Sequence, residues 1–270
     1  MRGFFRILFF LALVILVFVF DLTLQLLCLP LGLRRARKVI MAFGPCWARV
    51  FAFIMGIKFE TKGRHHIQPR QNYCIIANHL SYLDILFVGA LLPIRFVAKQ
   101  DVLYWPLFGL VAWLRGSIFV DRRITGARQR PYLDKIILAL RQGFNLIVFP
   151  EGTTSNGQQI LPFKKTIFSG PIKAGVPILP VTIRYATINH EPFSSRNCDL
   201  VCWYGSMTFA DHFWRVMNLK GFTVEITVHP PVRISPEDDW LEQNRRVASQ
   251  IRDIIAADYP VPQATEPFAG

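Results

Sequence analysis

The sequence predicts an α/β fold, in which a mostly parallel or mixed sheet is flanked by helices and preceded by an N-terminal membrane-associated helical segment. From Lys58 onward, short apolar and β-branched runs alternate with longer amphipathic segments, as is typical of strands joined by helices. Before that point the chain is largely apolar, and residues 7–20 contain no polar side chain.

The alternation places each expected element in turn. Strands are expected at residues 57–61, 73–78, 95–99, 117–120, 146–150, 178–185 and 223–229, and helices at 82–92, 104–114, 132–142, 163–174 and 240–257. We therefore divide the 270 residues into a membrane-associated helical segment (1–56), an α/β domain (57–259) and a Pro-rich tail (260–270) that is expected to be disordered.

The N-terminal segment admits more than one arrangement. Residues 7–33 are long enough to cross a bilayer if Asp21 is tolerated, but an embedded half-helix turning back near Asp21 or Pro30 fits equally well. A removed signal peptide is a third interpretation, although no small-x-small cleavage site follows. The basic run RRARK at 34–38 places the domain on the cytoplasmic face, and residues 39–59 are expected to form a helix against the membrane or the domain.

Charge is distributed unevenly along the chain. The formal net charge is +13, and all of the excess lies in the first 150 residues, beside the apolar segment. This arrangement favours anionic membrane lipids as partners. Nucleic-acid binding is not indicated, because no zinc-finger spacing, zipper or aromatic RNA-binding signature accompanies the charge.

The five cysteines form no CxxC pair and leave one over, so neither a disulfide framework nor a metal site is predicted. Cys198 and Cys202 lie near His190 and His212, but without matched ligand spacing. A reducing, cytoplasm-facing compartment fits this usage.

The most informative stretch is Asn78-His79-Leu80-Ser81-Tyr82-Leu83-Asp84, where an apolar strand meets a predicted helix start. On one continuous helix, residues five positions apart diverge, whereas His79 in the turn and Asp84 in the first helical turn can meet and form a base. The alternative is that Asp84 belongs only to a capping box and His79 is an ordinary loop histidine.

Three further blocks follow at predicted strand ends, where α/β sheets gather functional groups. Residues 115–123 form a strand that runs into Arg122 and Arg123, which could hold phosphate or could be a solvated strand end. Residues 149–155 (FPEGTTS) present an acid and hydroxyls in a turn before Lys164 and Lys165. Residues 176–181 (VPILPV) are typical of a core strand.

Together and in this order, the four blocks resemble the glycerolipid acyltransferases, the 1-acylglycerol-3-phosphate acyltransferases and their relatives. The resemblance covers about residues 70–190, together with the membrane-associated front end. It implies acyl transfer from acyl-ACP or acyl-CoA, used as co-substrate without a cofactor, to the hydroxyl of a lysolipid.

The resemblance assigns a role to each matching residue. His79 corresponds to the catalytic base and Asp84 to the group that orients it, with no acyl-enzyme required. Arg122 corresponds to the arginine that binds the acceptor's phosphate, and Glu151 with Gly152 to the acceptor-binding turn. The neighbouring Thr153 and Thr154 join the substrate-binding group. Lys164 and Lys165 could hold donor phosphates or anionic lipid, or could form a solvated helix end. Ser81 is expected from the helix-start pattern alone to cap the helix.

One position departs from the family pattern. The third block of the family most often ends Glu-Gly-Thr-Arg-Ser, whereas this chain has Thr154 in place of the arginine. Threonine cannot reproduce the planar fork with which arginine binds phosphate. The acceptor implied first is 1-acyl-sn-glycerol-3-phosphate, giving phosphatidic acid, and the alternative is lyso-ornithine lipid, giving ornithine lipid.

Two interpretations outside this enzyme class stay open. A non-catalytic membrane protein that binds anionic lipid would explain residues 1–60 and the basic strand ends. A hydrolase could use the same histidine and aspartate, but the chain has no G-x-S-x-G elbow and no metal-ligand set.

Overall fold

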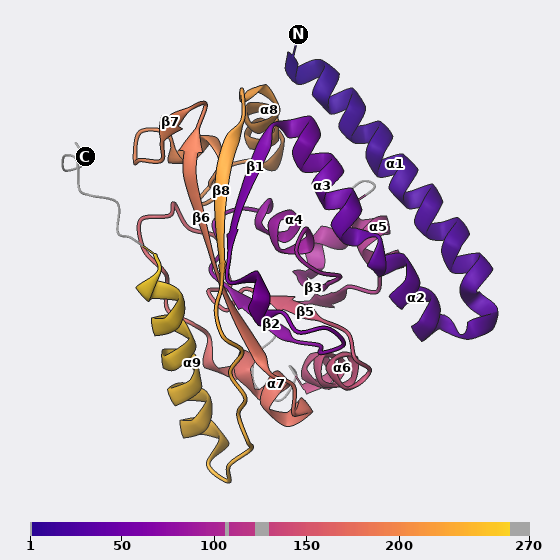
Figure 1. Cartoon of the computed structure of the whole chain (residues 1–270), viewed down its shortest axis with the longest axis vertical. Coiled ribbons are helices and arrows are strands. Elements are labelled where there is room, and N and C mark those ends of the chain that lie inside the picture. Colours follow the sequence, from indigo (N-terminus) through magenta and orange to yellow (C-terminus); the bar gives the residue numbers. More distant parts are fainter. Residues whose placement is uncertain (1, 106–107, 122–129, 260–270) are drawn as a thin grey trace.

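The protein is described by a computed structural model over residues 2–105, 108–121 and 130–259. Over these residues its centre is a mixed sheet (Figure 1). The strand order is β1 (Ile57–Lys62), β8 (Phe222–Val228), β6 (Ile178–Ile188), β2 (Cys74–Ala77), β5 (Leu146–Val148), β3 (Arg95–Lys99) and β4 (Ile118–Val120), with β7 (Glu191–Pro192) paired to β6.

Five adjacent strands, from β6 to β4, run parallel, whereas β8 is antiparallel to β6 and β1 is parallel to β8. The parallel strands therefore bring all their carboxyl ends to one edge, where ligand sites of such sheets form. All four residues of β2 are buried, as expected for a central strand covered on both faces. The predicted fold class is confirmed.

Helices cover both faces of the sheet (Figure 1). One face carries α1 (Arg2–Cys28), α3 (Gly44–Met55), α4 (Asp84–Gly89), α5 (Phe108–Leu114) and α8 (Phe209–Asn218). The other carries α6 (Arg130–Arg141), α7 (Ser169–Ala174) and α9 (Trp240–Ala257). The short α2 (Leu33–Ala42) connects α1 to α3, and 3-10 turns at Gln100–Tyr104 and Lys165–Phe168 precede α5 and α7.

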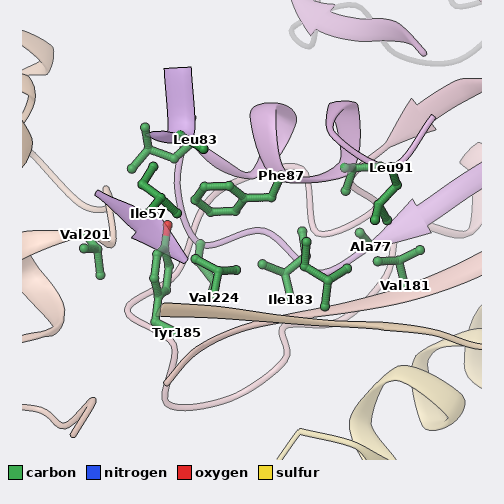
Figure 2. Packing of buried hydrophobic residues seen from close by; sticks show 14 of the residues in the cluster. Ile57, Ala77, Leu83, Phe87, Leu91, Val181, Ile183, Tyr185, Val201 and Val224 are labelled. Carbon is green, nitrogen blue, oxygen red and sulfur yellow. The ribbon is translucent and has the colours of Figure 1, made fainter. Parts of the chain in front are cut away.

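The larger core cluster packs the first helical layer on the sheet. Figure 2 shows Phe87 of α4 beside Tyr185 and Val224 of two neighbouring strands. The rings of Phe87 and Tyr185 meet edge to face, with centroids 5.9 Å apart. Phe10 of α1 and Phe51 of α3 join the same cluster, so the N-terminal helices belong to the domain core.

The N-terminal helices follow the prediction in part. α1 continues through Asp21 and turns back only at Leu29–Leu31, so the turn lies near Pro30 and not near Asp21. The helix expected over 39–59 is two helices, because the chain breaks at Phe43 and α3 restarts with a proline in its first turn. Gly56, with φ 70°, then ends α3 in the left-handed conformation.

Two stretches, Arg2–Leu31 and Leu33–Met55, are long and apolar enough to cross a membrane, with mean hydropathies of 3.0 and 1.5. Their outer faces expose large apolar side chains, including Phe9 of α1 and Phe53 of α3. Their inner faces pack on the domain, as the core cluster shows. This geometry is that of helices laid along the domain with one apolar side left uncovered.

The remaining predictions differ mainly at helix ends. Each predicted strand falls on a strand of the sheet, and α9 has the predicted bounds. α8 was not predicted, although Thr208 caps it by accepting a hydrogen bond from the Asp211 amide. The proposed tail lies outside the described residues.

Asp21 ties α1 to the domain. It is fully buried, and its carboxylate accepts two hydrogen bonds from Arg115 at the end of α5, at 2.5 and 3.1 Å. A buried charge of this kind is tolerated only with its partner present. The ion pair therefore specifies which side of the apolar helix faces the protein.

We predict that Asp21→Ala lowers the free energy of unfolding by about 3 kcal/mol, because it leaves the Arg115 side chain, which is only 11% exposed, without its partner. Thermal and chemical unfolding in detergent micelles measures this loss. The double variant Asp21→Leu/Arg115→Met should recover much of it. Equal losses in the single and double variants would contradict the assignment of the penalty to an unpaired charge.

Candidate active site

The candidate site begins at the carboxyl end of β2. Asn78, the residue after the strand, donates to the Ile183 carbonyl at 2.9 Å and accepts from the Ile183 amide at 2.8 Å. Through these two hydrogen bonds, the Asn78 side chain extends the pairing of β2 with β6 beyond the end of β2. It fixes where the chain leaves the sheet, and the next residue is His79.

His79 and Asp84 meet as predicted from the turn geometry. His79 Nδ1 lies 2.8 Å from Asp84 Oδ2, and the aspartate is fully buried. The same oxygen accepts the backbone N–H groups of Leu80 and Ser81, at 2.7 and 2.9 Å. An ionised carboxylate accepts a proton-bearing Nδ1, so Nε2 is the ring nitrogen that can take a proton.

The capping role predicted for Ser81 is wrong. No side chain caps α4, which begins at Asp84 itself. The Asp84 carboxylate instead accepts hydrogen bonds from the amides of Leu80 and Ser81, which precede the helix. These bonds stabilise the loop that carries His79. The interpretation of Asp84 as only a capping-box carboxylate is excluded by its bond to the imidazole.

The loop after β5 holds His79 by its backbone. Glu151 Oε1 accepts the His79 N–H at 2.9 Å, and the Ser155 N–H donates to the His79 carbonyl at 3.0 Å. The Phe149 ring stacks on the imidazole with centroids 3.9 Å apart and planes 9° apart. The histidine is therefore held at its backbone, its ring face and Nδ1.

Glu151 is buried and its carboxylate is engaged on both oxygens, since Oε2 accepts the Leu161 N–H at 3.3 Å. Burial raises the pKa of Glu151 to about 7, while the two backbone hydrogen bonds oppose this shift. The observed contacts of Glu151 brace the His79 loop. The acceptor-binding role that the family resemblance implies stays a prediction.

A largely apolar cavity of about 760 Å³ opens beside His79. Phe10 and Val14 of α1, Phe51 of α3, Leu86 of α4 and Phe108 of α5 contribute to its wall. The N-terminal helices therefore form one side of the cavity. A space of this size and chemistry suits an apolar chain.

Three of the predicted substrate-binding residues line the cavity. Gly152, Thr153 and Thr154 line the cavity beside His79. The Lys164 side chain packs over Gly152, where a Cβ would come within 2.5 Å of Lys164 Nζ, and Gly152 also has a φ of 72°. Both constraints favour glycine in this turn.

Lys165 and Arg122 are the remaining predicted substrate-binding residues. Lys165 begins the 3-10 turn before α7 and is exposed. Arg122, with its neighbour Arg123, lies outside the described residues.

Two residues at or beside the cavity were not predicted from the sequence. Tyr82 lines the cavity, and its hydroxyl is 3.0 Å from Nδ1 of His212, a buried residue of α8. Burial lowers the pKa of His212 to about 4, so its ring is neutral at physiological pH. Within the described residues, no group of three His, Cys, Asp or Glu side chains could hold a metal ion, and all five cysteines are unpaired.

Known proteins resemble this chain in sequence and in fold. A family model described as acyltransferase matches residues 58–184. The lyso-ornithine lipid O-acyltransferase of Rhizobium meliloti is 30% identical over 243 residues, covering 86% of this chain and 80% of that protein. The chain belongs to the acyltransferase family. It is an enzyme of this family, as the four ordered blocks predicted.

Two further acyltransferases extend the comparison. The 1-acyl-sn-glycerol-3-phosphate acyltransferase of Neisseria gonorrhoeae is 28% identical over 196 residues, covering 73% of this chain and 74% of that protein. The crystal structure of the 1-acyl-sn-glycerophosphate acyltransferase of Thermotoga maritima has a TM-score of 0.60 at 22% identity, covering 94% and 99% of the two chains. The latter shows a shared acyltransferase fold that includes the N-terminal helices.

The raised pKa of Glu151 predicts a pH effect on stability. Between its ordinary value of 4.5 and about 7, the folded protein binds more protons at this group than the unfolded protein does. Wild type should therefore lose stability as pH rises through this window, and Glu151→Gln should lose less. Melting temperatures in detergent across this window measure the difference, with the exposed Glu191→Gln as control. Parallel pH profiles for wild type and Glu151→Gln would refute the prediction.

Proposed function

We propose that this acyltransferase transfers a fatty acyl group from acyl-ACP or acyl-CoA to the free hydroxyl of a membrane lysolipid. The observation that carries the proposal is the His79–Asp84 pair, whose histidine lines the apolar cavity. The cavity offers room for an acyl chain, and the pair offers a base in its wall. No cofactor takes part in this reaction.

In the proposed reaction, His79 Nε2 accepts the proton of the lysolipid hydroxyl as that oxygen attacks the thioester carbonyl carbon. The carbon–sulfur bond then breaks, and the imidazolium returns the proton to the departing thiolate. Asp84 keeps the proton on Nδ1 and stabilises the positive ring. The acyl group therefore passes directly from the thioester to the lysolipid oxygen, and no covalent acyl-enzyme forms.

Membrane attachment is part of the proposal. The uncovered apolar side of α1 and α3 supports partial burial in the lipid, next to the cavity that these helices line. The basic residues of α2 support a cytoplasmic location for the domain, because positive flanks favour that side. An enzyme placed this way would draw its acceptor directly from the bilayer.

The first acceptor we propose is 1-acyl-sn-glycerol-3-phosphate, which the Neisseria gonorrhoeae relative is named for. Lyso-ornithine lipid is the second candidate, and two observations favour it. Thr154 lines the cavity where the family most often has arginine, and the Rhizobium meliloti relative is named for this acceptor.

We predict that His79→Ala lowers acyl transfer by about 10² to 10⁴-fold, because it removes the proposed general base. Asp84→Asn should also lower it, through the wrong tautomer of His79. The assay uses membranes supplied with both acceptors and both thioester donors. The exposed His65→Ala is the matched control. Undiminished transfer by His79→Ala would refute the base assignment, and lipid binding by wild type without transfer would favour a non-catalytic protein.

A second prediction concerns Thr154. Thr154→Arg should raise the use of 1-acyl-sn-glycerol-3-phosphate relative to lyso-ornithine lipid by about tenfold or more, since one charge-assisted phosphate contact contributes about 1.5 to 3 kcal/mol. The ratio of kcat/KM for the two acceptors measures the change. Thr153→Arg, the neighbouring and more exposed position, controls for added charge alone. An unchanged ratio would remove Thr154 as the determinant of acceptor choice.

A further inference from the structure

A second pocket, of about 390 Å³, lies at the opposite edge of the sheet from His79. Its polar residues are the three basic side chains of Arg37 in α2, Arg95 at the start of β3 and Lys135 in α6, together with Ser117 before β4 and Gln142 after α6. We call this set the basic pocket. Arg95 and Ser117 lie at the amino ends of parallel strands, whereas His79 follows the carboxyl end of β2, so the two sites are separated by the sheet.

The basic pocket concentrates positive charge. A Cβ on Gly116 would lie 2.5 Å from Arg95 Nη2 and 3.1 Å from Arg37 Nε, so the two guanidinium groups come close together at this glycine. Burial, together with the nearby Arg37, lowers the pKa of Arg95 to about 10. Among the described residues, no Asp or Glu lines the pocket. Like charges held this close favour an anion between them.

The hydrogen-bonding capacity of the basic pocket is only partly used. Arg95 is 8% exposed, and its Nε donates to the Gly116 carbonyl at 2.7 Å. Arg37 Nε and Ser117 Oγ are buried without a hydrogen-bond partner in the described part of the chain. Buried polar groups of native proteins are nearly always paired, so two orphaned donors in one pocket point to an absent acceptor.

The surroundings of the basic pocket are apolar and exposed. Trp113 of α5 and Leu138 of α6 line it and are 58% and 57% exposed. Leu110, one turn before Trp113, is also exposed, and α5 packs against the apolar α1. Tryptophan favours the membrane interface, where an apolar ring meets polar head groups. The pocket therefore combines cationic donors with a lipid-compatible rim.

We propose that the basic pocket binds the phosphate of an anionic membrane phospholipid, with the acyl chains of the lipid lying against Trp113 and Leu138. Arg37, Lys135 and Arg95 supply the charge, and Ser117 Oγ supplies a hydrogen bond. Cationic pockets beside membrane-associated helices have the chemistry that holds lipid head groups. This lipid is a bound partner and not a substrate, since His79 lies at the other edge of the sheet.

The test measures binding to the full chain in detergent, without any acyl donor. Melting temperature is followed against dihexanoyl phosphatidylglycerol, dihexanoyl phosphatidylcholine and inorganic phosphate. The pocket variant Arg37→Gln/Lys135→Gln is compared with Arg35→Gln/Arg130→Gln, which removes the same charge from exposed positions of the same two helices. A charge-retaining variant, Arg37→Lys/Lys135→Arg, controls for misfolding, because it changes both side chains and keeps their charges.

The phosphatidylglycerol concentration for half-maximal stabilisation should rise about tenfold or more in the pocket variant and change little in the surface and charge-retaining variants. Phosphatidylcholine should stabilise wild type less. Equal responses of the pocket and surface variants would overturn the site. Equal stabilisation by inorganic phosphate would overturn its assignment to a lipid. Because no transfer is measured, a failure here is distinct from a failure of the proposed acyltransferase reaction.

Discussion

One buried oxygen, Oδ2 of Asp84, organises the loop that carries His79. It accepts three hydrogen bonds, from the His79 ring and from the amides of Leu80 and Ser81. A buried carboxylate is stable only when donors replace the water it has lost, and here the donors belong to the loop that must be positioned. The same hydrogen bonds therefore stabilise the charge of Asp84 and fix the shape of the turn that carries His79.

The sheet separates two kinds of chemistry. At the carboxyl edge, the loops after β2 and β5 hold an imidazole beside an apolar cavity. At the amino edge, cations from α2 and from the start of β3 gather around Gly116. The N-terminal helices reach both edges, because α1 and α3 line the cavity and α2 carries Arg37. The N-terminal helices α1 to α3 therefore contribute to both sites and do more than attach the domain to a membrane.

Features that depend on residues close together in the chain could be predicted from the sequence. Strands such as β2 were predictable from short β-branched runs, and the meeting of His79 with Asp84 followed from a turn of five residues. The partners of Glu151 were not predictable, since Oε1 binds an amide 72 positions earlier in the chain. The basic pocket was not predicted for the same reason, because Arg37 and Ser117 come together only in the folded chain, where α2 packs against Leu114 of α5 and Phe144 before β5.

The ion pair between Asp21 and Arg115 bears on how the protein reaches a membrane. A lone helix with the composition of α1 would partition into lipid by itself, but Asp21 would then enter the hydrocarbon without Arg115, at a cost of about 2.5 to 3.5 kcal/mol. Docking on the folded domain removes that cost while leaving the opposite face apolar. For the attachment proposed above, folding and insertion are consequently coupled. In that proposed attachment, α1 would enter the bilayer lengthwise, already packed on the folded domain.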